Sequence, residues 1–64
     1  MQPYQERVVA EKKELDDKRA RLASFFNSDV YKDIDPEEQQ RLEDQLDAMT
    51  LYSNILGQRI ADFR

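Results

Sequence analysis

The 64-residue sequence contains no cysteine and no histidine, and it has only one glycine and two prolines. Without cysteine no disulfide can stabilise so short a chain, and without either residue the usual ligands of a structural zinc site are missing. Because a single chain of this size buries only about 60% of the surface that it exposes when unfolded, the remaining source of stability is assembly with further copies. We therefore expect a homo-oligomer.

Sequence patterns of membrane, secreted and catalytic proteins are absent as well. No apolar run approaches the roughly 20 residues needed to cross a bilayer, and nothing resembles a signal peptide, so we expect a cytoplasmic protein without membrane contacts. The chain has no nucleophile elbow and no glycine-rich phosphate loop, and no spacing of its carboxylates, tyrosines or lysines specifies an acid–base site. We expect no enzyme activity, no catalytic residue, no metal site and no cofactor.

What the sequence does contain is an apolar residue at every seventh position in two segments. A repeat of this period keeps one narrow stripe facing a partner helix along its whole length. The pattern predicts an all-α fold, an antiparallel two-helix hairpin that assembles into a homo-oligomeric helical bundle. The stripe residues, in the order in which they would face each other, are Leu22 and Leu42, Leu15 and Met49, and Val8 and Leu56, with Phe63 at the end of the second segment.

We expect one domain over residues 1–64, with a helix over about 4–26, a turn over about 27–35 and a helix over about 36–63. Pro3 is typical of a first helical turn. Asp35 before Pro36 predicts the start of the second helix, with the Asp35 carboxylate accepting from an amide of the first turn and Glu38 completing a capping box. The residues expected to close the turn end are Phe25, Phe26, Val30, Tyr31 and Ile34.

Polar and aromatic residues occupy the positions three residues after the stripe, where a plain coiled coil has leucine. In one interpretation these side chains pair with each other and fix the register or the oligomeric state. In the other, they belong to a groove at the mildly basic end of the hairpin, in which aromatic faces stack on bases and cations meet phosphates. The positions are Tyr4, Glu11, Lys18, Phe25, Gln45, Tyr52 and Arg59, and the groove would be lined by Tyr4, Arg7, Lys12, Tyr52 and Arg59.

The second helix carries more apolar surface than one partner helix can cover. Leu46 and Ile60 widen one side of its stripe, and Ala48, Leu51 and Ile55 extend the other side. A stripe of this width indicates a second packing surface, whereas scattered surface residues would be the plainer explanation. The formal net charge of −4 argues against duplex DNA as a partner of the protein.

Taken together, these residues resemble a known family. The pattern is Arg7-Val8, Glu11-Lys12, Glu14-Leu15, Leu22 and Phe25, then Gln45, Met49, Tyr52, Leu56-Gly57 and Arg59-Ile60. It is similar to small hairpin proteins of tailed phages that are related to the anti-CBASS cyclic-oligonucleotide sponges and share a hairpin domain with certain anti-Thoeris sponges. The resemblance covers nearly the whole chain.

The resemblance implies a phage immune-evasion protein of the host cytoplasm, a homo-oligomer and typically a homohexamer. It would bind cyclic di- and trinucleotide second messengers between protomers and sequester them without cleavage. Tyr4 matches the family's base-stacking tyrosine, and Lys12 matches its basic residue, with Lys18 as the competing candidate. Arg7 and Arg59 are added as phosphate partners because of their charge and placement.

Longer members of that family carry a short helix ahead of the hairpin, whereas three residues precede Tyr4 in this sequence, so the resemblance does not extend to a site built by that helix. The alternative function is a helical protein-interaction module that docks its apolar stripe on a host protein and inhibits it.

Overall fold

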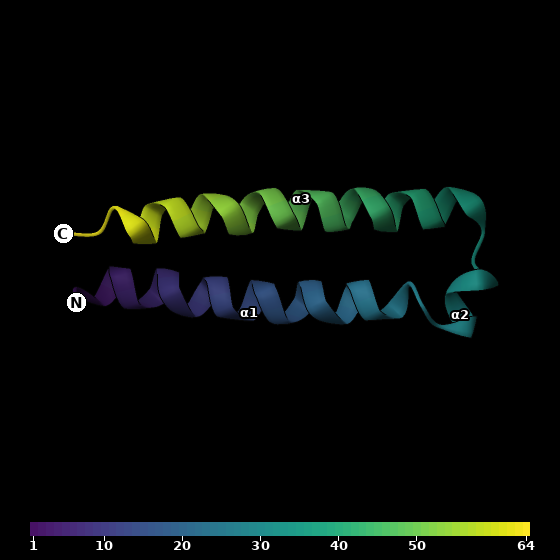
Figure 1. Cartoon of the computed structure of the whole chain (residues 1–64), viewed down its shortest axis with the longest axis horizontal. Coiled ribbons are helices and arrows are strands. Elements are labelled where there is room, and N and C mark those ends of the chain that lie inside the picture. The colour runs from purple at the N-terminus through teal and green to yellow at the C-terminus, as the bar shows by residue number, and fades with distance from the viewer.

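The computed structural model describes residues 1–64 and is all-helical, as predicted, with 83% of the residues in helices and no strand. Helix α1 spans Pro3–Phe25, α2 spans Asp29–Lys32 and α3 spans Pro36–Ala61. The two long helices lie side by side and run in opposite directions, so both termini are at one end of the molecule (Figure 1). The molecule measures 47 × 15 × 13 Å. None of its helices has the length and apolar character required to cross a membrane.

Both long helices begin with proline at their first position, where the missing N–H group costs no hydrogen bond. At the start of α1, the Gln2 N–H donates to Gln5 Oε1 at 2.8 Å. At the start of α3, the Asp35 side chain accepts no capping hydrogen bond, so the predicted capping box is wrong. Glu38 instead pairs with Arg41 Nε at 2.7 Å, one turn further along the same helix.

The turn contains a short helix, α2, that the sequence pattern did not predict. Ser28 Oγ caps it by accepting from the Tyr31 N–H at 3.2 Å, and it donates to the Phe25 carbonyl at 2.7 Å. The Tyr31 ring packs edge-to-face on Phe25 and also contacts Phe26. Val30 is 64% exposed, so the expectation that it closes the turn end is wrong. One helical turn cannot point both Val30 and Tyr31 at the same neighbours.

Two hydrogen bonds join the turn to the start of α3. The side chain of Gln39 donates to the Tyr31 carbonyl at 2.7 Å, and Tyr31 Oη donates to Glu43 Oε1 at 3.4 Å. Partial desolvation of the phenol, followed by the negative charge of Glu43, raises the pKa of Tyr31. The phenol is therefore neutral and available as a hydrogen-bond donor at physiological pH.

The apolar core between α1 and α3 is small. Val8, Leu15 and Leu56 are buried, as the sevenfold repeat predicts. Three half-buried side chains pack against them, namely Met49, Ile60 and Phe63. The accessible surface is 4929 Å², whereas a compact monomer of 7.6 kDa exposes about 4,300 Å². The single chain therefore leaves more surface uncovered than a compact protein of its mass.

Beside the stripe, a second column of side chains in each helix faces the seam between α1 and α3, and it lies four residues after the stripe. The sequence-based prediction, which placed this column three residues after the stripe, is wrong. A sevenfold repeat fixes one column and is compatible with either spacing for the other. The spacing of four buries Leu46 and Ile60, whereas three would have buried Gln45 and Arg59. The buried or half-buried residues of this column are Gln5, Lys12 and Arg19 in α1 and Leu46, Ser53 and Ile60 in α3; Tyr4, Glu11, Lys18, Gln45, Tyr52 and Arg59 are exposed.

Candidate functional site

Two faces flank the seam, and each carries a different set of polar groups. On the first, which we term the aromatic face, α1 contributes Tyr4 and Arg7 and α3 contributes Tyr52 and Arg59. In each helix these residues are three or seven positions apart, and such residues share one side. The second face centres on Asp16, which contacts side chains of both long helices. We term that group the Asp16 cluster.

On the aromatic face, Tyr4 and Arg59 lie close together at the open end of the helix pair. They line one hollow of about 370 Å³ with Asp62, Phe63 and Arg64, and Asp62 is paired with Arg64. The Tyr4 ring is 51% exposed and packs edge-to-face with Phe63, with ring centroids 5.9 Å apart. Because Phe63 holds the ring in place while half of it stays accessible, a planar group can stack on Tyr4.

Arg7 and Tyr52 extend the aromatic face away from the termini. Arg7 is one helical turn from Tyr4, and Tyr52 is two turns before Arg59. Neither Arg7 nor Arg59 makes an ion pair, so both guanidinium groups are free to meet an anion. Guanidinium groups bind phosphate oxygens in a bidentate geometry, which makes this face suited to a ligand with bases and phosphates.

The structure separates Lys12 from the other four candidate residues. Lys12 lies in the seam and reaches toward the Asp16 cluster, where its Nζ donates to Asp16 Oδ2 at 2.7 Å and to Ser53 Oγ at 3.1 Å. Lys18, the competing candidate, is exposed on the flank of the aromatic face. The cation predicted for the aromatic groove is therefore engaged on the opposite side of the seam.

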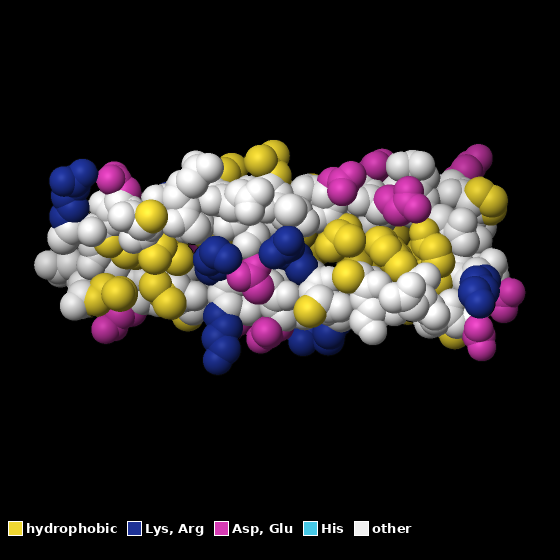
Figure 2. Space-filling view, in the orientation of Figure 1, with side chains coloured by type: hydrophobic (Ala, Val, Ile, Leu, Met, Phe, Trp, Pro, Cys, Tyr) yellow, Lys and Arg dark blue, Asp and Glu magenta, His cyan; other side chains and the backbone are white.

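The Asp16 cluster joins α1 to α3 through charged and hydroxyl groups. Arg19 Nη1 lies 2.9 Å from Asp16 Oδ1, which also accepts from Ser53 Oγ, and Arg19 Nε donates to Thr50 Oγ1 at 3.3 Å. Hydrogen bonds from Lys12, Ser53 and Arg19, in that order, hold the pKa of Asp16 well below its usual range. Figure 2 shows acidic and basic side chains together midway along the groove, with hydrophobic side chains toward both ends.

The Lys12 side chain packs against α3 at Gly57, where the absence of a side chain leaves room for it. A β-carbon at position 57 would lie 3.3 Å from Lys12 Cε, which is closer than an ordinary contact. Asp16, Arg19 and Ser53 were not predicted as a group from the sequence. Their signals were the small hydroxyl of Ser53 between Leu46 and Ile60, and the spacing of four between Lys12 and Asp16.

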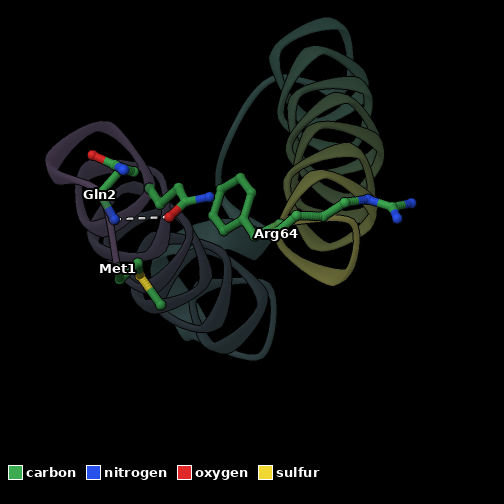
Figure 3. Close-up of a pocket in the computed structure, with 5 residues that line it drawn as sticks. Met1, Gln2 and Arg64 are labelled. Carbon is green, nitrogen blue, oxygen red and sulfur yellow. Dashed lines mark hydrogen bonds between the residues drawn. The ribbon is translucent and has the colours of Figure 1, made fainter.

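Another hollow, of about 440 Å³, lies at the termini between Met1, Gln2 and Arg64 (Figure 3). Its one cationic side chain, Arg64, is 3.3 Å from Asp62, and the Gln2 N–H is already bonded to Gln5. No group of three or more acidic side chains is arranged to hold a metal ion. The aromatic face therefore offers the better combination of free cations and a stacking surface.

These features define a small all-helical protein with an exposed face of aromatic and basic side chains. The chain belongs to the Sequestin family, whose model matches residues 2–62. The family name denotes sequestration of a ligand, which fits a sponge-type protein. No curated protein and no solved structure matches the chain.

Proposed function

We propose that the protein binds cyclic di- and trinucleotide second messengers and sequesters them without cleavage, as a phage immune-evasion protein in the host cytoplasm. Family membership supports sequestration, and the resemblance to anti-CBASS and anti-Thoeris sponges supports the choice of ligand. The aromatic face is the observation that carries the proposal. It combines an accessible tyrosine with two unpaired arginines, which are the groups that a base and a phosphate require.

In this mechanism each residue of the aromatic face has a distinct role. Tyr4 stacks on a base, an interaction worth about 1–3 kcal/mol, and Arg7 and Arg59 contact phosphate oxygens. Tyr52 offers a second ring further along the groove. The resemblance places the ligand between protomers, so that the Tyr4 side chains of two chains stack on the two bases of one cyclic dinucleotide. Capture is stoichiometric, because nothing in the site activates a nucleophile.

We further propose that the protein assembles with itself, as a hexamer or another homo-oligomer, through the outer side of α3. Leu51 is 63% exposed there, and Ile55 and Ala48 are also exposed. Contiguous exposed apolar residues are typical of interaction surfaces. Ile55 lies between Tyr52 and Arg59 on the edge of the aromatic face. An interface at Ile55 brings the aromatic faces of two copies together, as a shared ligand requires.

A thermal-shift panel of the purified protein against cyclic di- and trinucleotides tests the proposal. Ligand at 100-fold over its dissociation constant stabilises the folded protein by about 2.7 kcal/mol. For a domain of this size, that gain corresponds to a rise in melting temperature of about 10–20 °C. No shift with any member of the panel would contradict nucleotide capture.

The alternative function, docking on a host protein to inhibit it, is favoured by the same exposed side chains of α3. Charge reversal separates the two. Arg7→Glu and Arg59→Glu abolish nucleotide binding and leave assembly intact if the protein is a sponge. A docking module tolerates both changes and loses its host target with Leu51→Asp or Ile55→Asp. Lys12→Glu is unsuitable for this test, because it would also break the Asp16 cluster.

A further inference from the structure

The hydrogen-bond donors of the Asp16 cluster converge on one anion, and that anion is the carboxylate of Asp16 itself. One carboxylate accepts hydrogen bonds from Lys12, Arg19 and Ser53, which come from both long helices. Ammonium, guanidinium and hydroxyl groups converging on one point are also the groups that bind a phosphate. Two cations face a single carboxylate, so the cluster carries a net positive charge of about one unit.

Several donors of the cluster are free. Lys12 uses two of its three N–H groups, on Asp16 and Ser53, and no hydrogen bond engages Arg19 Nη2. The side chains of Lys12, Asp16 and Arg19 are 31%, 36% and 30% exposed, so an anion from solvent can reach them. A hollow of about 290 Å³ lies directly against Asp16 and Arg19, with Ala20, Ala23 and Leu46 on its other sides.

We propose that the Asp16 cluster is a second ligand site, which binds a phosphate group through Lys12, Arg19 and Ser53, and that the Asp16 carboxylate occupies these donors until the phosphate displaces it. The inference rests on the proposed function for the identity of the ligand, a nucleotide phosphate. Asp16 is then an internal competitor, which lowers the affinity for every anion, so that only strongly binding anions displace it.

Displacement needs only a side-chain rotation. Asp16 lies on the flank of the seam beside the hollow, so its carboxylate can turn toward solvent while Lys12 and Arg19 keep their places along α1. The carboxylate stays ionised after displacement, because an aspartate without these donors has a pKa of about 3.9, well below neutral pH. Weak anions such as a single carboxylate cannot displace it, because Asp16 is tethered beside the donors at a high effective concentration.

The test compares Asp16→Asn with Asp17→Asn, using calorimetric titration with inorganic pyrophosphate in a phosphate-free buffer. Both variants lose one negative charge, but Asp17 is exposed and makes no ion pair. Removing a charge about 4 Å from the ligand raises anion affinity at least about fivefold even at the dielectric constant of water. We expect that gain for Asp16→Asn and a change below about twofold for Asp17→Asn, whose charge is solvent-screened.

An unchanged or weaker affinity in Asp16→Asn overturns the inference, and so does an equal gain in both variants, which would reflect net charge alone. If Asp16→Asn does not fold by circular dichroism, Arg19→Gln carries the test. That variant keeps Asp16, and we expect it to bind pyrophosphate at least about fivefold more weakly than the unchanged protein. Equal affinity in Arg19→Gln would also overturn the inference.

The probe separates this inference from the proposed function. Pyrophosphate has no base, so its binding does not depend on Tyr4, and Tyr4→Ala should leave the pyrophosphate affinity unchanged. A fivefold gain in Asp16→Asn together with no binding of any cyclic nucleotide would contradict the proposed function and support the anion site. Binding of cyclic nucleotides, together with an unchanged pyrophosphate affinity in Asp16→Asn, would support the proposed function and contradict the anion site.

Discussion

Replacing Leu56 by alanine removes an apolar side chain that is completely buried between α1 and α3. Truncating a buried leucine to alanine costs about 2–5 kcal/mol, because the transfer free energy is lost and a cavity is left. A chain of 64 residues has a total stability of about 3–10 kcal/mol. Leu56→Ala therefore removes a large share of the free energy of unfolding. Urea denaturation followed by circular dichroism measures the loss, and we expect the melting temperature to fall by at least about 8 °C.

Leu51→Ala is the matched control, since it makes the same chemical change on the same helix at a side chain that is 63% exposed. In a monomer it changes stability by less than about 0.5 kcal/mol. In an oligomer that uses this surface it costs more, and the loss depends on protein concentration. A loss below about 1 kcal/mol for Leu56→Ala would refute the assignment of the core, because a fully buried leucine cannot be removed so cheaply.

Three further predictions concern the candidate sites. Tyr4→Ala lowers the affinity for a cyclic dinucleotide by about 5- to 150-fold in calorimetry, which is the equivalent of one stacked base. Tyr4→Phe retains the affinity, because the ring is kept. Equal affinities for the unchanged protein, Tyr4→Ala and Tyr4→Phe would contradict stacking. The pKa of Asp16 is lowered in the folded state, so the ionised carboxylate stabilises the fold above about pH 4, and this stabilisation is lost as the pH falls below that value. Asp16→Asn should therefore flatten the dependence of the free energy of unfolding on pH, measured by urea titration between about pH 5 and 3. Gly57→Ala raises helix stability by up to about 1 kcal/mol, because alanine has a higher helix propensity than glycine. The flexible Lys12 side chain can move by a few tenths of an ångström to make room for the added β-carbon. A lower melting temperature would show that it cannot.

The sequence was sufficient to predict the elements that depend on short-range rules. The sevenfold repeat placed Val8, Leu15 and Leu56 in the core, because a heptad keeps one column of side chains on one side of a helix. Pro36 indicated the start of α3 for a local steric reason. The repeat and the proline both act within one helix, so neither depends on the side chains of the facing helix.

The candidate sites depended on pairing between helices, and there the prediction was partly wrong. The polar column was assigned three residues after the stripe rather than four, since Gln45 and Arg59 were not weighed against Leu46 and Ile60 as buried residues. Lys12 was predicted to line the aromatic groove because of its charge and the family resemblance, whereas it passes Gly57 to reach Asp16 and Ser53. Only the three-dimensional arrangement shows that one carboxylate engages two cations from α1 and a hydroxyl from α3.

Capture without cleavage is the central claim, and recovery of the ligand tests it most directly. The protein is incubated with each cyclic di- or trinucleotide that shifts its melting temperature, separated from free ligand by gel filtration and denatured by heat. Chromatography of the released material should show the intact cyclic nucleotide, in a fixed ratio to protein that does not change with incubation time. Release of a linear product, or co-elution of no nucleotide with the protein, would contradict sequestration.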